Sequence, residues 1–252
     1  MSAEAENAFS TTARLILGGP LEGIDSYGPW LMRHLGQERT CNSFFHSKKL
    51  RLILQYAFME KIPSNRILGF DEIKEARQLS LQPANLSTLK GVVGEFAKIA
   101  LFNLDMRKGE DRNNPETIGV EDTLNTYKSQ DAFNSKWVSH TSYTKFAEYS
   151  FGCYRLFYSK YCINCYNCVK CTCCFECDSL KECSRAYFCH NCENVHDALF
   201  CSNAKNLRYA VCNVPVGKES YERIKAILLT YVLTELKSKK SLEQDIFNIG
   251  EK

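Results

Sequence analysis

Long apolar runs are missing from this chain of 252 residues, and none approaches the roughly 18 residues of a membrane-spanning helix. A signal peptide is not indicated, because Glu4 and Glu6 stand where positive charge is required and the run Leu15-Ile16-Leu17 is short. A strong excess of one charge is also missing, since the formal net charge is +3. This balance implies neither a nucleic-acid partner nor an acidic one. We therefore expect a cytoplasmic protein, which includes a virus-encoded intracellular one.

Familiar catalytic motifs are missing as well. The chain has no GxSxG elbow, Walker phosphate loop, HExxH zinc motif or dinucleotide fingerprint. A nucleophilic cysteine needs a lowered pKa and a neighbouring base, and the sequence singles out no thiol on these grounds. The sequence therefore predicts no catalytic residue and favours a protein without catalytic activity.

Cysteine is scarce outside one segment and abundant within it. Thirteen of the fourteen cysteines lie between Cys153 and Cys212, and the other is Cys41. In an intracellular compartment such cysteines are thiols or metal ligands rather than disulfides. The role of cysteine is therefore a question about one segment of the chain.

A period of three runs through this segment and well beyond it. Every third residue from Thr117 to Ala210 is uncharged and no larger than leucine, and eleven of the thirteen clustered cysteines share this phase. Strands repeat every two residues and helices every 3.6, so either would bring charged residues into the phase. A polyproline bundle would need regular glycine, whereas only Gly119 and Gly152 occur there. The period predicts a narrow β-solenoid over residues 116–214.

Small inward residues imply a thin core in which thiols act as compact fillers. The inward positions singled out as structural core are Cys153, Cys183, Cys201, Ala198, Ala204 and Leu207. Asparagine tolerates the left-handed conformation that a corner needs, and it often precedes the inward phase. These asparagines are Asn125, Asn134, Asn164, Asn167, Asn191, Asn194, Asn203 and Asn206.

Aromatic residues crowd one stretch of the other two phases. They are Tyr143, Phe146, Tyr149, Phe151, Tyr154, Phe157, Tyr158 and Tyr161. They suit either packing against a neighbouring domain or an exposed recognition strip, and packing is favoured because large aromatic side chains are mostly buried.

The flanking regions are predicted to be helical, which makes the fold class α+β. In a mainly helical domain over 1–115, helices are expected at Ser47–Lys61, Asp71–Leu79 and from Ser87 to Leu104, followed by a polar linker at Lys108–Pro115. Over residues 215–252, a helix from Gly217 to about Lys237 precedes a charged, loosely held tail. Its apolar residues Leu228, Tyr231 and Val232 are expected to cap the open solenoid or to pair subunits.

Metal binding is the alternative role for the cysteines. Cys-x-x-Cys pairs have zinc-knuckle spacing, and two pairs supply a four-thiolate site for zinc or an iron–sulfur cluster. The candidate ligands are Cys162, Cys165, Cys168, Cys171, Cys174, Cys177, Cys189 and Cys192. Zinc modules separate their pairs by chain-reversing loops, whereas these pairs run on in phase with Ala, Val, Thr and Leu. Core packing without a cofactor is therefore favoured.

The run from Tyr187 to Lys225, YFCHNCENVHDALFCSNAKNLRYAVCNVPVGKESYERIK, resembles a group of cysteine-rich repeat proteins of archaea, uncultured bacteria and some of their viruses. Members end a ladder of Asn-Cys units with an N-x-K-x-Y-x-x-x-N element, followed by a K-E-x-Y helix start. The matching residues here are Asn203, Lys205, Tyr209, Asn213, Lys218, Glu219 and Tyr221. The resemblance covers the last half of the chain and implies the solenoid architecture, but no activity.

These observations favour a structural or protein-binding scaffold, as a subunit of a larger cellular or viral assembly. The expected partner is a protein or a second copy, bound through a solenoid face or the last helix, with no membrane or nucleic acid. A zinc or iron–sulfur module is the second hypothesis. An enzyme whose site lies in the N-terminal half is the third.

Overall fold

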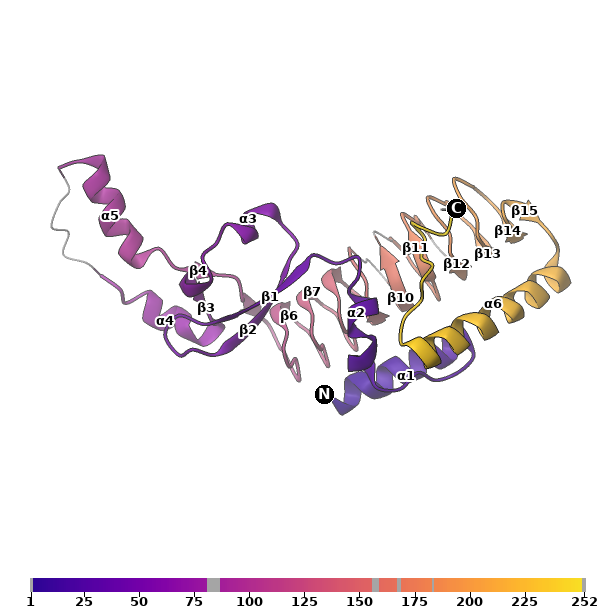
Figure 1. Ribbon diagram of the computed structural model, residues 1–252, viewed down its shortest axis with the longest axis horizontal. Helices are drawn as coiled ribbons and strands as arrows, with labels where there is room; N and C mark the ends of the chain where they lie inside the picture. Colours follow the sequence, from indigo (N-terminus) through magenta and orange to yellow (C-terminus); the bar gives the residue numbers. More distant parts are fainter. Residues whose placement is uncertain (1, 81–86, 156–158, 167–168, 183, 251–252) are drawn as a thin grey trace.

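A computed structural model describes residues 2–80, 87–155, 159–166, 169–182 and 184–250. Figure 1 shows a rod of stacked coils with an extension at one end. This extension, here termed the arm, consists of the described residues between 37 and 106. Two helices, α1 (Ala3–Leu17) and α6 (Lys218–Lys239), lie side by side along the rod.

The rod is a β-solenoid, which confirms the predicted architecture. Parallel strands pair residues twelve apart, such as Val120 with Ala132 and Ala198 with Ala210, so four triplets make one coil. About eight such coils stack along the rod. The parallel strands are β5 (Arg107–Lys108), β6 (Ile118–Glu121), β7 (Gln130–Phe133), β8 (Ser142–Lys145), β9 (Glu148–Phe151), β10 (Lys160–Tyr166), β11 (Phe175–Asp178), β12 (Ala186–Tyr187), β13 (His196–Leu199) and β14 (Arg208–Val211). Because β5 already pairs with β6, the solenoid includes part of the segment predicted to be a linker.

The chain turns at the residue before each inward position, where the backbone is mostly left-handed. The predicted asparagine corners are confirmed by positive φ at Asn125, Asn134, Asn164, Asn191, Asn194, Asn203 and Asn206, while Asn167 lies outside the described residues. Bulky residues such as Trp137 and His140 adopt the same conformation. A left-handed residue that carries a Cβ costs roughly 1–2 kcal/mol. Hydrogen bonds between coils, such as Leu124 N to Ser135 O at 3.1 Å, offset this cost.

The inward phase forms the thin core. Its described positions from Thr117 to Ala210 are buried, except for the half-buried Leu207. Cys153, Cys201, Ala198 and Ala204, four of the residues singled out from the sequence, lie in one buried cluster. Leu156, Cys168 and Cys183 fall outside the described residues.

A second core lies between the rod and its helices. One outward residue per coil contributes to it, giving the column Tyr127, Phe151, Ile163, Phe175, Tyr187 and Leu199. Phe9 of α1 meets the ring of Phe151 edge-on, with centroids 5.3 Å apart. The expected packing of the aromatics is therefore found at Phe151, Tyr149 and Tyr161, whereas Phe146 is exposed and Phe157 and Tyr158 lie outside the described residues.

The N-terminal region mixes strands with helices, so the prediction of a mainly helical domain is wrong. The helix expected at Ser47–Lys61 is instead strand β2 (Lys49–Leu54), antiparallel to β1 (Gln37–Asn42), with only a helical turn at α3 (Ala57–Glu60). Leu50, Leu52 and Leu54 alternate as a strand requires, while Leu50, Ile53 and Leu54 also fit a helical stripe. Periodicity alone cannot decide such a short run.

Other elements of this region agree better with the sequence. The helix expected at Asp71–Leu79 is present as η3 (Phe70–Glu72) and α4 (Ile73–Ala76), and the one expected from Ser87 is α5 (Leu89–Ile99). The elements not predicted are α1, η1 (Ile24–Tyr27), α2 (Gly28–Leu31), η2 (Ser64–Arg66) and the short parallel pair β3 (Ile67–Leu68) and β4 (Phe102–Asn103).

The C-terminal helix is confirmed, but it lies along the rod instead of closing its end. Strand β15 (Val214–Pro215) turns back and pairs with β14, and α6 then returns beside α1 (Figure 1). Val232 is buried against the second core and Leu228 is half-buried, whereas Tyr231 is largely exposed. The tail is not loosely held, because Leu242 and Asp245 are buried.

Candidate functional site

The predicted metal ligands line the core of the rod. Cys162, Cys165, Cys171, Cys174, Cys177, Cys189 and Cys192 are buried, and Cys168 lies outside the described residues. Most of these thiols donate to the carbonyl two residues earlier, such as Cys177 Sγ to Phe175 O and Cys192 Sγ to His190 O, both at 3.2 Å. Ser129 Oγ makes the same bond to Tyr127 O at 2.9 Å. The thiols therefore occupy the structural position of core hydroxyls.

Neighbouring sulfurs along the rod also contact one another. The hydrogen bond with Cys177 raises the pKa of the Cys189 thiol well above its usual range. The hydrogen bond with Cys189 in turn lowers the pKa of Cys192 and lowers that of Cys201 to about 7. Across the described ranges, no three His, Cys, Asp or Glu side chains are gathered as a metal ion would require.

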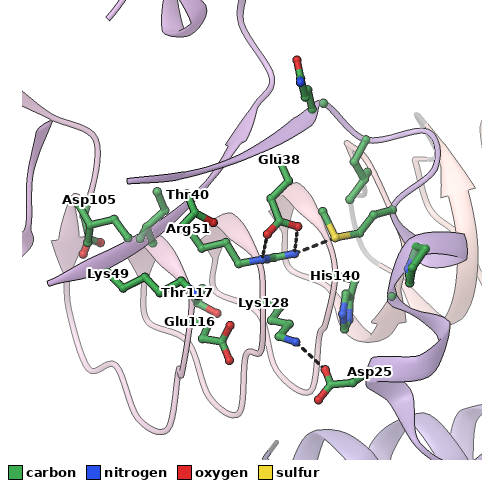
Figure 2. Close-up of a pocket in the computed structure, with 18 of the residues that line it drawn as sticks. Asp25, Glu38, Thr40, Lys49, Arg51, Asp105, Glu116, Thr117, Lys128 and His140 are labelled. Atoms are coloured by element: carbon green, nitrogen blue, oxygen red, sulfur yellow. Dashed lines mark hydrogen bonds and ion pairs between the residues drawn. The ribbon is translucent and has the colours of Figure 1, made fainter. Parts of the chain in front are cut away.

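A polar cavity of about 960 Å³ lies between the β1–β2 hairpin, α2 and the first coils (Figure 2). Arg51 from β2 donates from Nε and Nη2 to the two carboxylate oxygens of Glu38, both at 2.8 Å. Lys128, at a solenoid corner, lies 2.7 Å from Asp25 Oδ1. Burial alone would raise the pKa of Asp25, but hydrogen bonds from Lys128 and Tyr127 lower it. The two basic groups are thus already engaged by acids of the chain itself.

His140 lies at the next corner beyond Lys128 and is buried. Desolvation lowers its pKa to about 3, so the ring is neutral. Its Nδ1 lies 2.8 Å from Ser139 Oγ, and a Cβ on Gly28 would lie 3.2 Å from its Nε2. The imidazole therefore fills the joint between α2 and the solenoid. Sequence analysis did not single out these residues, although Lys128, His140 and Gly152 stand twelve apart in the corner phase.

A buried polar junction joins three distant segments further along the rod. Arg33 Nη2 lies 2.6 Å from Glu176 Oε1, and its Nη1 donates to Leu242 O at 2.8 Å. Asn164 Nδ2 also donates to Glu176 Oε1 at 3.0 Å. Burial outweighs these contacts and raises the pKa of Glu176 to about 7. The junction fixes α2 and the tail to the thiol-rich coils.

The arm carries the most apolar exposed surface among the described residues. Helix α5 stands at the far end of the arm (Figure 1), begins with Thr88 Oγ1 accepting from Gly91 N and buries none of its residues. Its apolar residues Leu89, Val92, Val93 and Phe96, here termed the α5 face, point to solvent, with Leu89 80% and Phe96 63% exposed. The side chain of Glu95, in contrast, is only 17% exposed.

The orientation of α5 is fixed at its C-terminal end. Arg66 donates from Nη1 to the carbonyl oxygens of Ala97 and Ala100, two acceptors at the end of the helix. Directly after the helix, β4 pairs with β3, which continues from the segment of Arg66. The contacts of Arg66 and the β3–β4 pair therefore hold α5 with its apolar face outward.

Next to α5 lies a groove of about 700 Å³, here termed the arm groove. Its apolar lining includes Tyr56, Phe58, Met59, Leu101, Phe102 and Met106. Asp131 of β7 and Lys61 also line the groove, and Asp131 accepts a hydrogen bond from Gln55. Burial raises the pKa of Asp131 to about 6, and no ion pair of the described chain reaches it.

Comparison with known proteins finds no family model, no curated protein and no solved structure that matches this chain. The structure establishes a cysteine-rich β-solenoid, while the resemblance to Asn-Cys repeat proteins rests on the sequence elements alone. In the described part of the chain, no helix is both long and apolar enough to cross a membrane.

Proposed function

We propose that this chain is a non-catalytic scaffold, in which a rigid solenoid rod holds a protein-binding arm. The observation that carries this proposal is the α5 face. An amphipathic helix of a folded protein normally turns its apolar stripe toward the core. Here the stripe faces solvent, with Val93 55% exposed, while the side chain of Glu95, paired with Lys98, is only 17% exposed.

Contiguous exposed apolar surface of this kind marks interaction sites on soluble proteins. The helix is held by Arg66 and by the β3–β4 pair, so the face is presented in one orientation. A preorganised surface loses less conformational entropy when it binds.

The sides of the rod differ from the arm. Charged residues twelve apart pair along it, as in Lys205–Glu193 at 2.6 Å and Arg185–Asp197 at 2.7 Å. Such ladders satisfy their own charges and leave a solvated surface. The rod therefore suits the role of a spacer, and the arm that of the binding element.

The test compares the tagged wild-type chain with the double variant Val93→Glu/Phe96→Glu, both expressed in native cells. Ile227→Glu is the matched control, because Ile227 of α6 is 67% exposed but lies outside the arm. We expect a protein partner that copurifies with the wild type and the control, is lost from the double variant, and binds again when both proteins are purified. Identical sets of bound proteins for all three chains, each with wild-type circular dichroism, would refute the proposal.

A further inference from the structure

We infer that the partner of the α5 face is the arm groove of a second copy of this chain, with the two copies exchanging α5 helices reciprocally. This inference rests on the proposed function, because it takes the α5 face to be the binding surface. It adds the identity of the partner and the surface that receives the helix.

The first argument is that one arm carries both halves of an apolar contact. The α5 face offers four apolar side chains in a row, and the arm groove offers an apolar cavity of about 700 Å³. Neither is filled by another described part of the chain. Leu101 and Phe102 of the groove directly follow α5, so helix and groove are neighbours.

Neighbouring complementary surfaces suit a two-fold axis. In such an isologous contact, each copy gives its helix and receives the other, so every contact is made twice. Helix α5 has eleven residues and a length of roughly 16 Å. Making the contact twice doubles the area buried by this short helix, in the direction of the roughly 800 Å² per partner that a stable interface needs.

The second argument is charge complementarity. Asp131 in the lining of the groove has no basic partner among the described ion pairs. Lys90 stands on the first turn of α5 without an ion pair in the described residues, whereas Lys98 is bound to Glu95 at 2.8 Å. A helix that enters the groove brings Lys90 and its own positive N-terminal end toward this carboxylate. A half-buried acid that has a hydrogen bond from Gln55 but no ion pair among the described residues thereby gains a cation.

The inference is tested by sedimentation of the purified full chain over a range of concentrations. We expect a concentration-dependent dimer for the wild type and for the Ile227→Glu control. Val93→Glu/Phe96→Glu and, independently, the groove variant Met106→Glu should each weaken it by about thirtyfold or more. A photo-crosslinking residue at position 93 should join two copies, with the groove segment 101–106 as the attached peptide.

Charge complementarity is tested by a double-mutant cycle. Lys90→Gln should weaken the wild-type dimer by several-fold and have no further effect in an Asp131→Asn background. The inference is overturned by a wild-type monomer at all concentrations, or by a dimer that ignores Met106→Glu and crosslinks elsewhere. If the chain is a monomer but still recovers an α5-dependent protein from cells, the second copy is refuted and the proposed function stands. If neither is found, both are refuted.

Discussion

The two halves of the solenoid core use different chemistry in the same place. From Thr117 to Ser150 the inward residues are mostly threonine and serine, whereas from Cys153 to Cys201 they are mostly cysteine. In both halves several of these side chains donate to the carbonyl two residues earlier, at 2.8 Å for Ser135 and 3.2 Å for Cys177. Hydroxyl and thiol groups therefore take the same position relative to the backbone in the two halves.

Serines of the hydroxyl half also accept a hydrogen bond from the backbone of the next coil. Ser135 Oγ also accepts from Ala147 N at 3.1 Å, and Ser129 Oγ accepts from Thr141 N at 3.2 Å, one coil further along. Sulfur is a weaker acceptor than oxygen. Larger, polarisable thiols fill more of the core instead. The hydroxyl half thus relies more on hydrogen bonding, and the thiol half relies more on packing.

The largest expected difference between the halves is their opposite response to pH. His140, at a corner of the hydroxyl half, has a lowered pKa of about 3, so protonation of the unfolded chain destabilises the fold as pH falls below about 6.5. Glu176, at the same corner of the thiol half, has a raised pKa of about 7. Glu176 therefore ionises at a lower pH in the unfolded chain than in the folded one. Its contribution to the free energy of unfolding is fully present below pH 4.5 and is lost as pH rises toward 7.

Between about pH 4.5 and 6.5, the contributions of His140 and Glu176 to the free energy of unfolding change with pH in opposite directions. Single substitutions should separate the two contributions. Relative to the wild type, the free energy of unfolding of Glu176→Gln should rise with pH across this window, by about 1.4 kcal/mol per unit at most. In His140→Gln it should fall. Urea denaturation at half-unit pH steps measures both slopes, and wild-type slopes in both variants would contradict the assignment.

The second largest effect is expected at the boundary between the halves. A Cβ on Gly152 would lie 2.0 Å from Asn164 Oδ1 and 2.7 Å from Leu31 O, where the rod meets the segment after α2. Gly152→Ala should therefore cost about 2–3 kcal/mol of unfolding free energy. The control is Gly18→Ala, at the left-handed C-cap of α1, which has a similar positive φ but no neighbour within 4 Å. It should cost about 1 kcal/mol, and equal losses would show that steric contact at Gly152 is unimportant.

Matched truncations to alanine in the two halves of the solenoid core should differ less in their cost in unfolding free energy. Ser135→Ala leaves Ala147 N and Phe133 O without their side-chain partner, at a cost of about 2 kcal/mol. Cys177→Ala removes packing and the weaker thiol hydrogen bonds to Phe175 O and Ala186 O, at about 1 kcal/mol. Chemical denaturation of both variants ranks the costs. The reverse ranking would mean that thiol packing outweighs hydroxyl bonding.

The smallest expected effect is that of a metal chelator. If the thiol half only packs, excess EDTA should leave the unfolding midpoint unchanged, and the purified protein should contain zinc and iron far below one atom per chain. A lower midpoint that added zinc restores would assign the cysteines to coordination. The hydroxyl half would then be the half of the solenoid core that is stable without a metal ion.

The solenoid could be predicted from the sequence because its signal repeats. Each coil restates the same three-residue pattern, so the register, the asparagine corners and the inward cysteines follow from local rules. The N-terminal region has no such repetition. The stripe of Leu50, Ile53 and Leu54 fitted a helix, and only pairing with β1 decides for a strand.

The candidate binding surface could not be predicted from the sequence, for a related reason. The apolar stripe of α5 was visible in the sequence, but a stripe gives no indication of whether it faces a core or solvent. Its outward direction depends on Arg66, some thirty residues earlier, and on the pairing of Ile67 with Phe102. Likewise, the buried junction of Arg33, Glu176 and Asp245 joins residues that no local pattern connects.

The shared core between the rod and its helices has a consequence for biosynthesis. Coils bond to neighbours only twelve residues away, so each can form soon after it leaves the ribosome. Helix α1 emerges long before the coils that cover it, as the bond from Tyr187 Oη to Ile16 O shows. Such distant contacts form late, and until then the apolar side of α1 is a surface for chaperones or for misassembly.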